Sequence, residues 1–347
     1  MSKPILGIIG GGQLGSMLSV AAKKLGVKTV VFSDDIDAPA QKFSDVFIFG
    51  KYDDQNKIDE FISQVEIITY EFENIPYETL NQINKIKPVL PKPSINRIIQ
   101  HRLAEKDFIN KLNIRTTQYV SISNKSELYT VKDLLPGLLK TTTLGYDGKG
   151  QHLINSIEDV NELDIDFSKG YILEKLVRLK KEISIIITRF SDKKYEIYEP
   201  IENTHEDQIL KQSSIPADIS DKILKESKLW AMQLAEELRY VGTLCVEFFI
   251  DRNENLYVNE IAPRVHNSGH LTINAYNVSQ FENHVRAVCN LSQIKLNKIS
   301  NAKMINLIGS QITVYRNKQF ESNEFFFDYL KKEIKHKRKM GHLTTLF

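Results

Sequence analysis

The chain has 347 residues, of which 41% are hydrophobic and 26% are charged. This composition is typical of a globular protein with two or three domains, and it argues against a disordered or fibrous chain. A net charge of +2 gives no general affinity for nucleic acid or for an anionic membrane, so neither partner is expected. No apolar segment is long enough to span a bilayer or to serve as a signal peptide. Two cysteines, Cys245 and Cys289, make no disulfide framework, so we expect buried reduced thiols in a cytoplasmic protein.

The first 100 residues alternate short apolar runs with amphipathic stretches. Runs at 5–9, 27–32 and 65–70 predict buried strands. Residues 14–25 repeat apolar side chains at helical spacing, and a second helix is expected near 57–64. Strands that alternate with helices indicate a parallel α/β sheet.

The rest of the chain has mixed patterns. After three closely spaced prolines, residues Ile95, Ile98, Ile99 and Leu103 predict one long helix. Another helix is predicted at 220–239. Further strands, some of them paired in hairpins, are predicted at 138–140, 172–176, 183–190, 195–198, 244–250 and 256–261.

A first glycine loop, Gly10, Gly12 and Gly15, fits the pattern G-x-G-x-x-G between a strand and a helix. The N–H groups of such a loop can hold a phosphate, and Asp34 lies near the position of a ribose-binding acid. A nicotinamide-dependent oxidoreductase is therefore one alternative. Glycines that only permit a tight turn and close helix packing are the favoured reading, another ligand comes second, and the nicotinamide cofactor comes last.

A second glycine loop follows the predicted strand that ends in Lys140. Three glycines within six residues provide backbone N–H groups for an anion, and lysines add positive charge. This pattern suits a triphosphate that must be covered and then released, although an ordinary hairpin turn fits equally well. The loop comprises Gly145, Tyr146, Asp147, Gly148, Lys149, Gly150 and Gln151.

A pair of carboxylates interrupts the apolar hairpin strands near the C-terminal third of the chain. Glu247 and Glu260 are costly in such strands unless a partner neutralises them. If the strands pair, the two acids reach one site, where Mg²⁺ would relieve their repulsion and Asn259 would be a third oxygen ligand. The alternative is an ion-pair network with Arg264 or Lys140.

Taken together, these residues resemble the ATP-grasp superfamily, in which a glycine loop closes on ATP and two acids on adjacent strands bind magnesium. Within it the chain resembles the 5-(carboxyamino)imidazole ribonucleotide synthase family of purine synthesis. The similarity runs over nearly the whole chain. Its motifs are Gly12-Gln13-Leu14-Gly15, Glu71-Phe72-Glu73-Asn74, the loop 145–151 and the run from Asn259 to His270.

The resemblance implies a fold and a reaction. The expected fold is α/β, with α+β character in the ATP-grasp part, divided into an N-terminal domain (1–105), a central lid (106–177) and a C-terminal domain (178–347). The expected reaction joins bicarbonate to 5-aminoimidazole ribonucleotide at the expense of ATP, through carboxyphosphate, and gives ADP and phosphate. A homodimer is also implied.

The resemblance assigns nucleotide contacts residue by residue. Arg102 and Lys140 would contact the phosphates under the loop, and Glu247 and Glu260 would bind Mg²⁺. The adenine connector, the ribose ligand, a further nucleotide neighbour and the residue beside the metal would be Glu174, Lys175, Leu176, Val177, Glu182, His205 and Asn259.

Candidate substrate contacts follow from position next to the predicted metal ligands and, for the basic run, from the resemblance. Arg264 and His266 are candidates for bicarbonate, and Tyr146 and Asp147 would reach the reaction from the loop. The basic run 331–339 is either a solvated surface or, through its last two residues, a phosphate site. Candidate ribonucleotide ligands are Glu71, Asn74, Asn267, Ser268, His270, Arg338 and Lys339.

Two departures from the family stand out. Ser16 replaces an arginine, and Leu144 replaces the first of two glycines that enter the loop. A nucleotide-binding protein without activity is therefore a further alternative. Independently of these departures, the nearest alternative is a formate-using ATP-grasp ligase.

Overall fold

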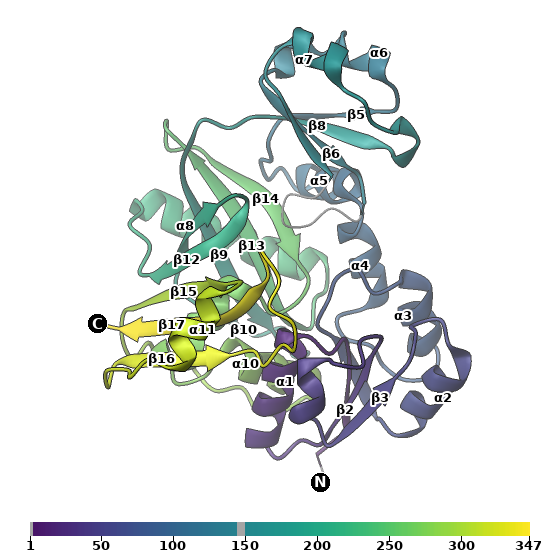
Figure 1. Ribbon diagram of the computed structural model, residues 1–347, viewed down its shortest axis with the longest axis vertical. Helices are drawn as coiled ribbons and strands as arrows, with labels where there is room; N and C mark the ends of the chain where they lie inside the picture. The colour runs from purple at the N-terminus through teal and green to yellow at the C-terminus, as the bar shows by residue number, and fades with distance from the viewer. Residues whose placement is uncertain (1–2, 144–149) are drawn as a thin grey trace.

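The computed structural model describes residues 3–143 and 150–347, which form three sheets (Figure 1). The mixed α/β class expected from the sequence is confirmed. Among the described residues, no helix combines the length and apolar character needed to cross a membrane. Both cysteines are free and buried, as predicted. Five predicted loop residues and Leu144 lie outside the described residues: Gly145, Tyr146, Asp147, Gly148 and Lys149.

The N-terminal domain is built on a parallel sheet of order β3-β2-β1-β4. Its apolar strands are covered by helices, as the alternating pattern predicts. Strand β3 and helix α3 were not predicted. The elements are β1 (Leu6–Ile9), α1 (Gln13–Lys24), β2 (Thr29–Ser33), β3 (Val46–Phe49), α2 (Gln55–Ser63), β4 (Ile67–Tyr70) and α3 (Tyr77–Asn84).

The long helix predicted after the prolines is wrong, because the chain breaks it in two. Helix α4 (Pro93–Ile99) ends before His101, whose backbone is extended and whose side chain accepts a hydrogen bond from Ala104 N. This cap starts helix α5 (Arg102–Lys111). The break places Arg102 at the first position of α5, where its side chain lies 3.6 Å from Glu260.

The central lid is a four-stranded antiparallel sheet of order β5-β8-β6-β7. It stands apart at one end of the molecule, above α5 (Figure 1). Short helices α6 (Lys125–Leu128) and α7 (Ile157–Glu162) pack on it. The strands are β5 (Tyr119–Ile122), β6 (Gly137–Thr141), β7 (Gln151–Ile154) and β8 (Tyr171–Lys175).

The remaining strands form one sheet of order β14-β13-β9-β11-β12-β15-β17-β16, with β10 paired to β9. Apolar side chains of β9 and β13 pack on helix α8 (Asp221–Glu237), while helix α10 (Gln280–Val288) joins this sheet to α1. Both predicted hairpins are present. The strands are β9 (Leu179–Arg189), β10 (Tyr195–Ile197), β11 (Ile201–Glu206), β12 (Ile209–Ile215), β13 (Gly242–Asp251), β14 (Leu256–Ala262), β15 (Ala302–Ile308), β16 (Glu324–Asp328) and β17 (Lys339–Leu346).

Candidate active site

A cavity of about 790 Å³ lies where the three sheets meet, and it gathers most of the predicted site residues. Its walls come from the N-terminal domain, the lid and the large sheet. Of the predicted residues, the cavity is lined by Glu71, Asn74, Arg102, Lys140, Gln151, Leu176, Glu182, His205, Glu247, Asn259, Glu260, Arg264, His266, Asn267, Arg338 and Lys339.

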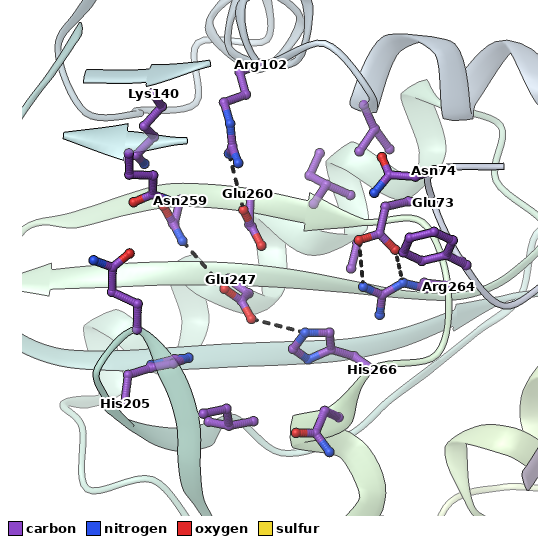
Figure 2. Close-up of a pocket in the computed structure, with 18 of the residues that line it drawn as sticks. Glu73, Asn74, Arg102, Lys140, His205, Glu247, Asn259, Glu260, Arg264 and His266 are labelled. Atoms are coloured by element: carbon purple, nitrogen blue, oxygen red, sulfur yellow. Dashed lines mark hydrogen bonds and ion pairs between the residues drawn. The ribbon is translucent and has the colours of Figure 1, made fainter. Parts of the chain in front are cut away.

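The two predicted metal ligands are direct partners across the β13–β14 ladder, where Glu247 stands opposite Glu260 (Figure 2). The register shifts just beyond this pair. Burial and then the Glu260 charge raise the pKa of Glu247 to about 7. A divalent cation would relieve this repulsion, and carboxylate oxygens are the ligands that Mg²⁺ prefers, so the residues present fit that ion.

Three further side chains surround this carboxylate pair. Arg102 Nη1 lies 3.6 Å from Glu260 Oε2, and His266 Nε2 lies 3.2 Å from Glu247 Oε1. The Asn259 amide lies 3.5 Å from Glu247 Oε2 and donates to it. Figure 2 shows Arg102 and Lys140 descending toward these acids from the opposite wall. Cations and acids thus line one cavity, as a magnesium triphosphate would need.

The residues of the predicted adenine connector, 174–177, differ in their surroundings: one is buried in the interior and one lines the cavity. Glu174 is buried, and its Oε1 lies 3.2 Å from Lys140 Nζ. Burial alone would raise the pKa of Glu174, but neighbouring lysines hold it down at about 2. Leu176 instead lines the cavity with a half-exposed apolar side chain, which suits a purine face. Lys175 and Val177 do not line it.

The predicted ribose ligand, Glu182, pairs with His205. His205 Nδ1 lies 2.6 Å from Glu182 Oε2, because the neighbouring strands β9 and β11 bring the two side chains to the same face. Burial lowers the pKa of His205, but the Glu182 carboxylate outweighs it and raises the pKa above its usual value. The pair can therefore accept and donate hydrogen bonds toward sugar hydroxyls.

Arg264 forms a two-pronged ion pair with Glu73, a residue to which the sequence analysis gave no role. Its Nη2 donates to Glu73 Oε1 at 3.0 Å, and its Nε donates to Oε2. Burial would raise the pKa of Glu73, but Arg264 lowers it below its usual value. The pair joins the N-terminal domain to the end of β14, and it orients the guanidinium toward the cavity (Figure 2).

The first glycine loop already holds an anion, the carboxylate of Glu71. Gly12 N donates to Oε1 at 2.7 Å, and Gly15 N donates to Oε2 at 2.9 Å. A Cβ at Gly12 would lie 2.8 Å from the same carboxylate, so the glycines serve this close approach. Ser16 Oγ donates to Gly12 O within the same turn. Because these N–H groups already bind Glu71, they are not available to the phosphates of a dinucleotide, which argues against the nicotinamide alternative. Glu71 also lines the cavity.

The predicted substrate residues after β14 separate into one cavity residue and two interior ones. Asn267 lines the cavity and exchanges amide hydrogen bonds with Asn306. Ser268 and His270 are fully buried away from it, which departs from their predicted direct contact. Ser268 Oγ lies 2.9 Å from His266 Nδ1 and thereby orients that ring.

The basic run 331–339 is part cavity wall and part surface. Arg338 and Lys339 line the cavity, together with Lys331 and Lys337. Lys335, in contrast, is exposed and pairs with Glu333. The solvated reading therefore fits Lys335, while the phosphate reading stays a prediction for the two cavity residues Arg338 and Lys339.

A small antiparallel sheet lies above two carboxylates that suit a metal ion, and Lys140 and Arg102 lie between the sheet and the carboxylates. This arrangement defines an ATP-grasp ligase. The ATP-grasp domain matches residues 107–281, the ribonucleotide synthetase preATP-grasp domain matches 2–100, and the phosphoribosylaminoimidazole carboxylase C-terminal domain matches 302–347. The chain belongs to the N5-carboxyaminoimidazole ribonucleotide synthase family.

Similarity to individual relatives extends along the whole chain. The Bacillus subtilis N5-carboxyaminoimidazole ribonucleotide synthase is 39% identical over 347 residues, which cover 99% of this chain and 91% of the relative. The structure of an N5-carboxyaminoimidazole ribonucleotide synthetase bound to ADP matches with a TM-score of 0.94 at 37% identity, covering 100% of this chain and 94% of the other. The Aspergillus clavatus enzyme in complex with ADP and 5-aminoimidazole ribonucleotide matches with a TM-score of 0.91 at 26% identity, covering 99% and 94%.

Proposed function

We propose that this chain carboxylates 5-aminoimidazole ribonucleotide with bicarbonate and ATP, and that the cavity between the three sheets is where this happens. The observation that carries the proposal is the facing arrangement of Glu247 and Glu260 with Arg102 and Lys140. It supplies anions for a metal and cations for a triphosphate in one cavity. Family membership favours bicarbonate over the formate alternative.

On the nucleotide side, Lys140 and Arg102 would neutralise the phosphates as charge shifts in the transition state. Glu247 and Glu260 would hold Mg²⁺, which polarises phosphoryl oxygens when bound. Leu176 would lie against the purine, and Glu182 with His205 would hold the ribose hydroxyls. Asn259 would steady the Glu247 carboxylate through its amide.

On the substrate side, Arg264 and His266 would bind bicarbonate beside the γ-phosphate. A bicarbonate oxygen attacks phosphorus, ADP leaves, and carboxyphosphate breaks down to CO₂ and phosphate. The exocyclic amine of the ribonucleotide then attacks the carbon of CO₂, and its proton passes to the released phosphate. A closed cavity would keep water away from the carboxyphosphate intermediate.

The ribonucleotide itself would be held from the opposite end. Arg338 and Lys339 would bind its 5′-phosphate, while Asn74 and Asn267 would offer amides to its ribose. Tyr146 and Asp147 stay proposed contacts from the glycine loop. A homodimer and a cytoplasmic location also stay predictions; light scattering on the purified protein would test the former.

A phosphate-release assay tests the function. Phosphate should form at a substantial rate only when bicarbonate and 5-aminoimidazole ribonucleotide are both present with magnesium ATP. An unchanged rate after removal of bicarbonate would contradict the proposal, and a rate restored by formate would favour the other ligase.

A further inference from the structure

A third cation, Lys106, lies behind the nucleotide side of the cavity, on the second turn of α5. Its side chain is 2% exposed, and its Nζ lies 3.2 Å from Glu174 Oε2. The same Nζ donates to Thr117 Oγ1 at 3.2 Å, and Thr117 Oγ1 in turn donates to Glu174 Oε2 at 3.0 Å. A buried lysine with such fixed partners has a defined role in the charge balance of its surroundings.

Glu174 is shared between two lysines. Its Oε2 faces Lys106, and its Oε1 lies 3.2 Å from Lys140 Nζ. Two ammonium groups on one carboxylate leave an excess of positive charge in a buried cluster. Of the three side chains, only Lys140 lines the cavity. Through Lys140, the excess charge is therefore available to an anion in the cavity.

Removal of Lys106 would change this balance. Lys140 and Glu174 alone would make a neutral buried pair, and turning Lys140 toward a phosphate would leave the buried carboxylate uncompensated, which is costly. With Lys106 present, Glu174 keeps a partner whichever way Lys140 turns. Lys140 can then exchange between Glu174 and a triphosphate without that penalty.

Helix α5 also connects this cluster to β14, the strand that carries the predicted metal ligand Glu260. The neighbouring residue, Glu105, accepts a hydrogen bond from Ile261 N at 2.6 Å, next to Glu260 in the edge strand β14. Consecutive residues of α5 thus contact the large sheet and strand β8 of the lid. Lys106 is placed where the two halves of the nucleotide site meet.

We propose that Lys106 is a positioning residue for ATP: by neutralising Glu174 from behind, it frees the charge of Lys140 for the triphosphate. This inference rests on the proposed contact between Lys140 and ATP.

Steady-state kinetics of Lys106→Met test the inference. We expect KM for ATP to rise about tenfold or more, with KM for 5-aminoimidazole ribonucleotide within about twofold of wild type. Adding Glu174→Gln to Lys106→Met removes the uncompensated carboxylate and should recover a large part of the ATP affinity. The matched control is Lys111→Met, an exposed lysine at the other end of α5, which should leave both KM values unchanged.

Thermal unfolding and a second set of variants separate the possible outcomes. A lower melting temperature for Lys106→Met with an unchanged KM for ATP would overturn the inference, because that is the result of a purely structural role. If Lys106→Met does not fold, Thr117→Val removes only the bridging hydroxyl; it should raise KM for ATP a few-fold, and no change would equally overturn the inference.

Lys140→Met distinguishes this inference from the role on which it rests. An unchanged KM for ATP in Lys140→Met would contradict the proposed phosphate contact itself. A raised KM in Lys140→Met combined with an unchanged KM in Lys106→Met would refute only the role of Lys106.

Discussion

Glu247 and Glu260 face each other on neighbouring strands; Arg102 lies 3.6 Å from the Glu260 carboxylate, and the neutral ring of His266, whose pKa burial lowers, lies 3.2 Å from that of Glu247. Burial raises the pKa of Glu247, and repulsion from Glu260 raises it further, to about 7. The pair is therefore poised for a divalent cation.

Replacement of Glu260 by Gln should abolish most magnesium-dependent turnover. One charged ligand is lost, so we expect kcat to fall about 100-fold or more and the magnesium requirement to rise. Phosphate release measured against magnesium concentration checks this, with circular dichroism to confirm folding. The control is Glu254→Gln in the turn of the same hairpin, where Glu254 pairs with Lys180 at the surface. Full activity in Glu260→Gln would remove the metal assignment.

Arg264→Lys should damage the bicarbonate step more than ATP binding. A lysine cannot reproduce the two-pronged pairing with Glu73, so the cation loses its orientation. We expect kcat to fall about 100-fold and KM for bicarbonate to rise, with KM for ATP within about twofold. Arg252→Lys, in the exposed turn of the β13–β14 hairpin, is the matched control. Unaltered bicarbonate kinetics would argue that Arg264 only joins the domains.

The basic run 331–339 contains both cavity cations and an exposed lysine, so it allows the proposed phosphate site to be tested against an internal control. Arg338→Ala or Lys339→Ala should raise KM for 5-aminoimidazole ribonucleotide about tenfold or more, because each removes a cavity cation from a phosphate. Lys335→Ala should have little effect, since that lysine is exposed and pairs with Glu333. Initial rates at varied ribonucleotide concentration measure this. Equal effects of all three substitutions would favour a diffuse electrostatic role over a phosphate site.

His284 should make the stability of the protein depend on pH. Its Nδ1 accepts from Thr243 N at 3.0 Å and its Nε2 lies 2.8 Å from Thr69 Oγ1, so the neutral ring joins the large sheet to β4. Burial lowers its pKa from 6.5 to about 4. The unfolded chain then binds the proton more tightly, so stability is fully present above pH 6.5 and is lost as pH falls toward 4.

The size of this effect follows from the shift, about 3 kcal/mol over that range. Urea unfolding between pH 4 and 7 should show a steeper loss for wild type than for His284→Gln, in which the amide can replace both hydrogen bonds without titrating. His342, whose pKa burial also lowers, is common to both proteins and cancels in the comparison. Parallel stability curves would show that His284 does not carry the effect.

The sequence predicted best those structural features that are determined by residues close together in the chain. Glu247 and Glu260 are joined by a short hairpin, so the alternation of the two strands was enough to place them together. The helical and apolar periods likewise located α1, α8 and nine strands, but not β11, β12 and β15 in the middle of the large sheet. Edge strand β3 was missed because its burial does not follow a clear alternation.

Contacts between distant segments could not be predicted in the same way. Arg264 and Glu73 are 191 positions apart, and no local pattern pairs a particular arginine with a particular acid. The break between α4 and α5 depends on His101 acting as a cap, which is a rare choice of residue for that position. Ser268 and His270 are polar side chains in a promising motif, yet the packing of the fold turns them inward.

The carboxylate of Glu71 in the first glycine loop has a consequence for what that loop can bind. A tethered anion competes at an effective concentration that a free dinucleotide does not reach, so the loop is permanently self-liganded. The Glu71 carboxylate therefore fastens the end of β4 to the start of α1, and the protein itself fills the loop that resembles a dinucleotide site.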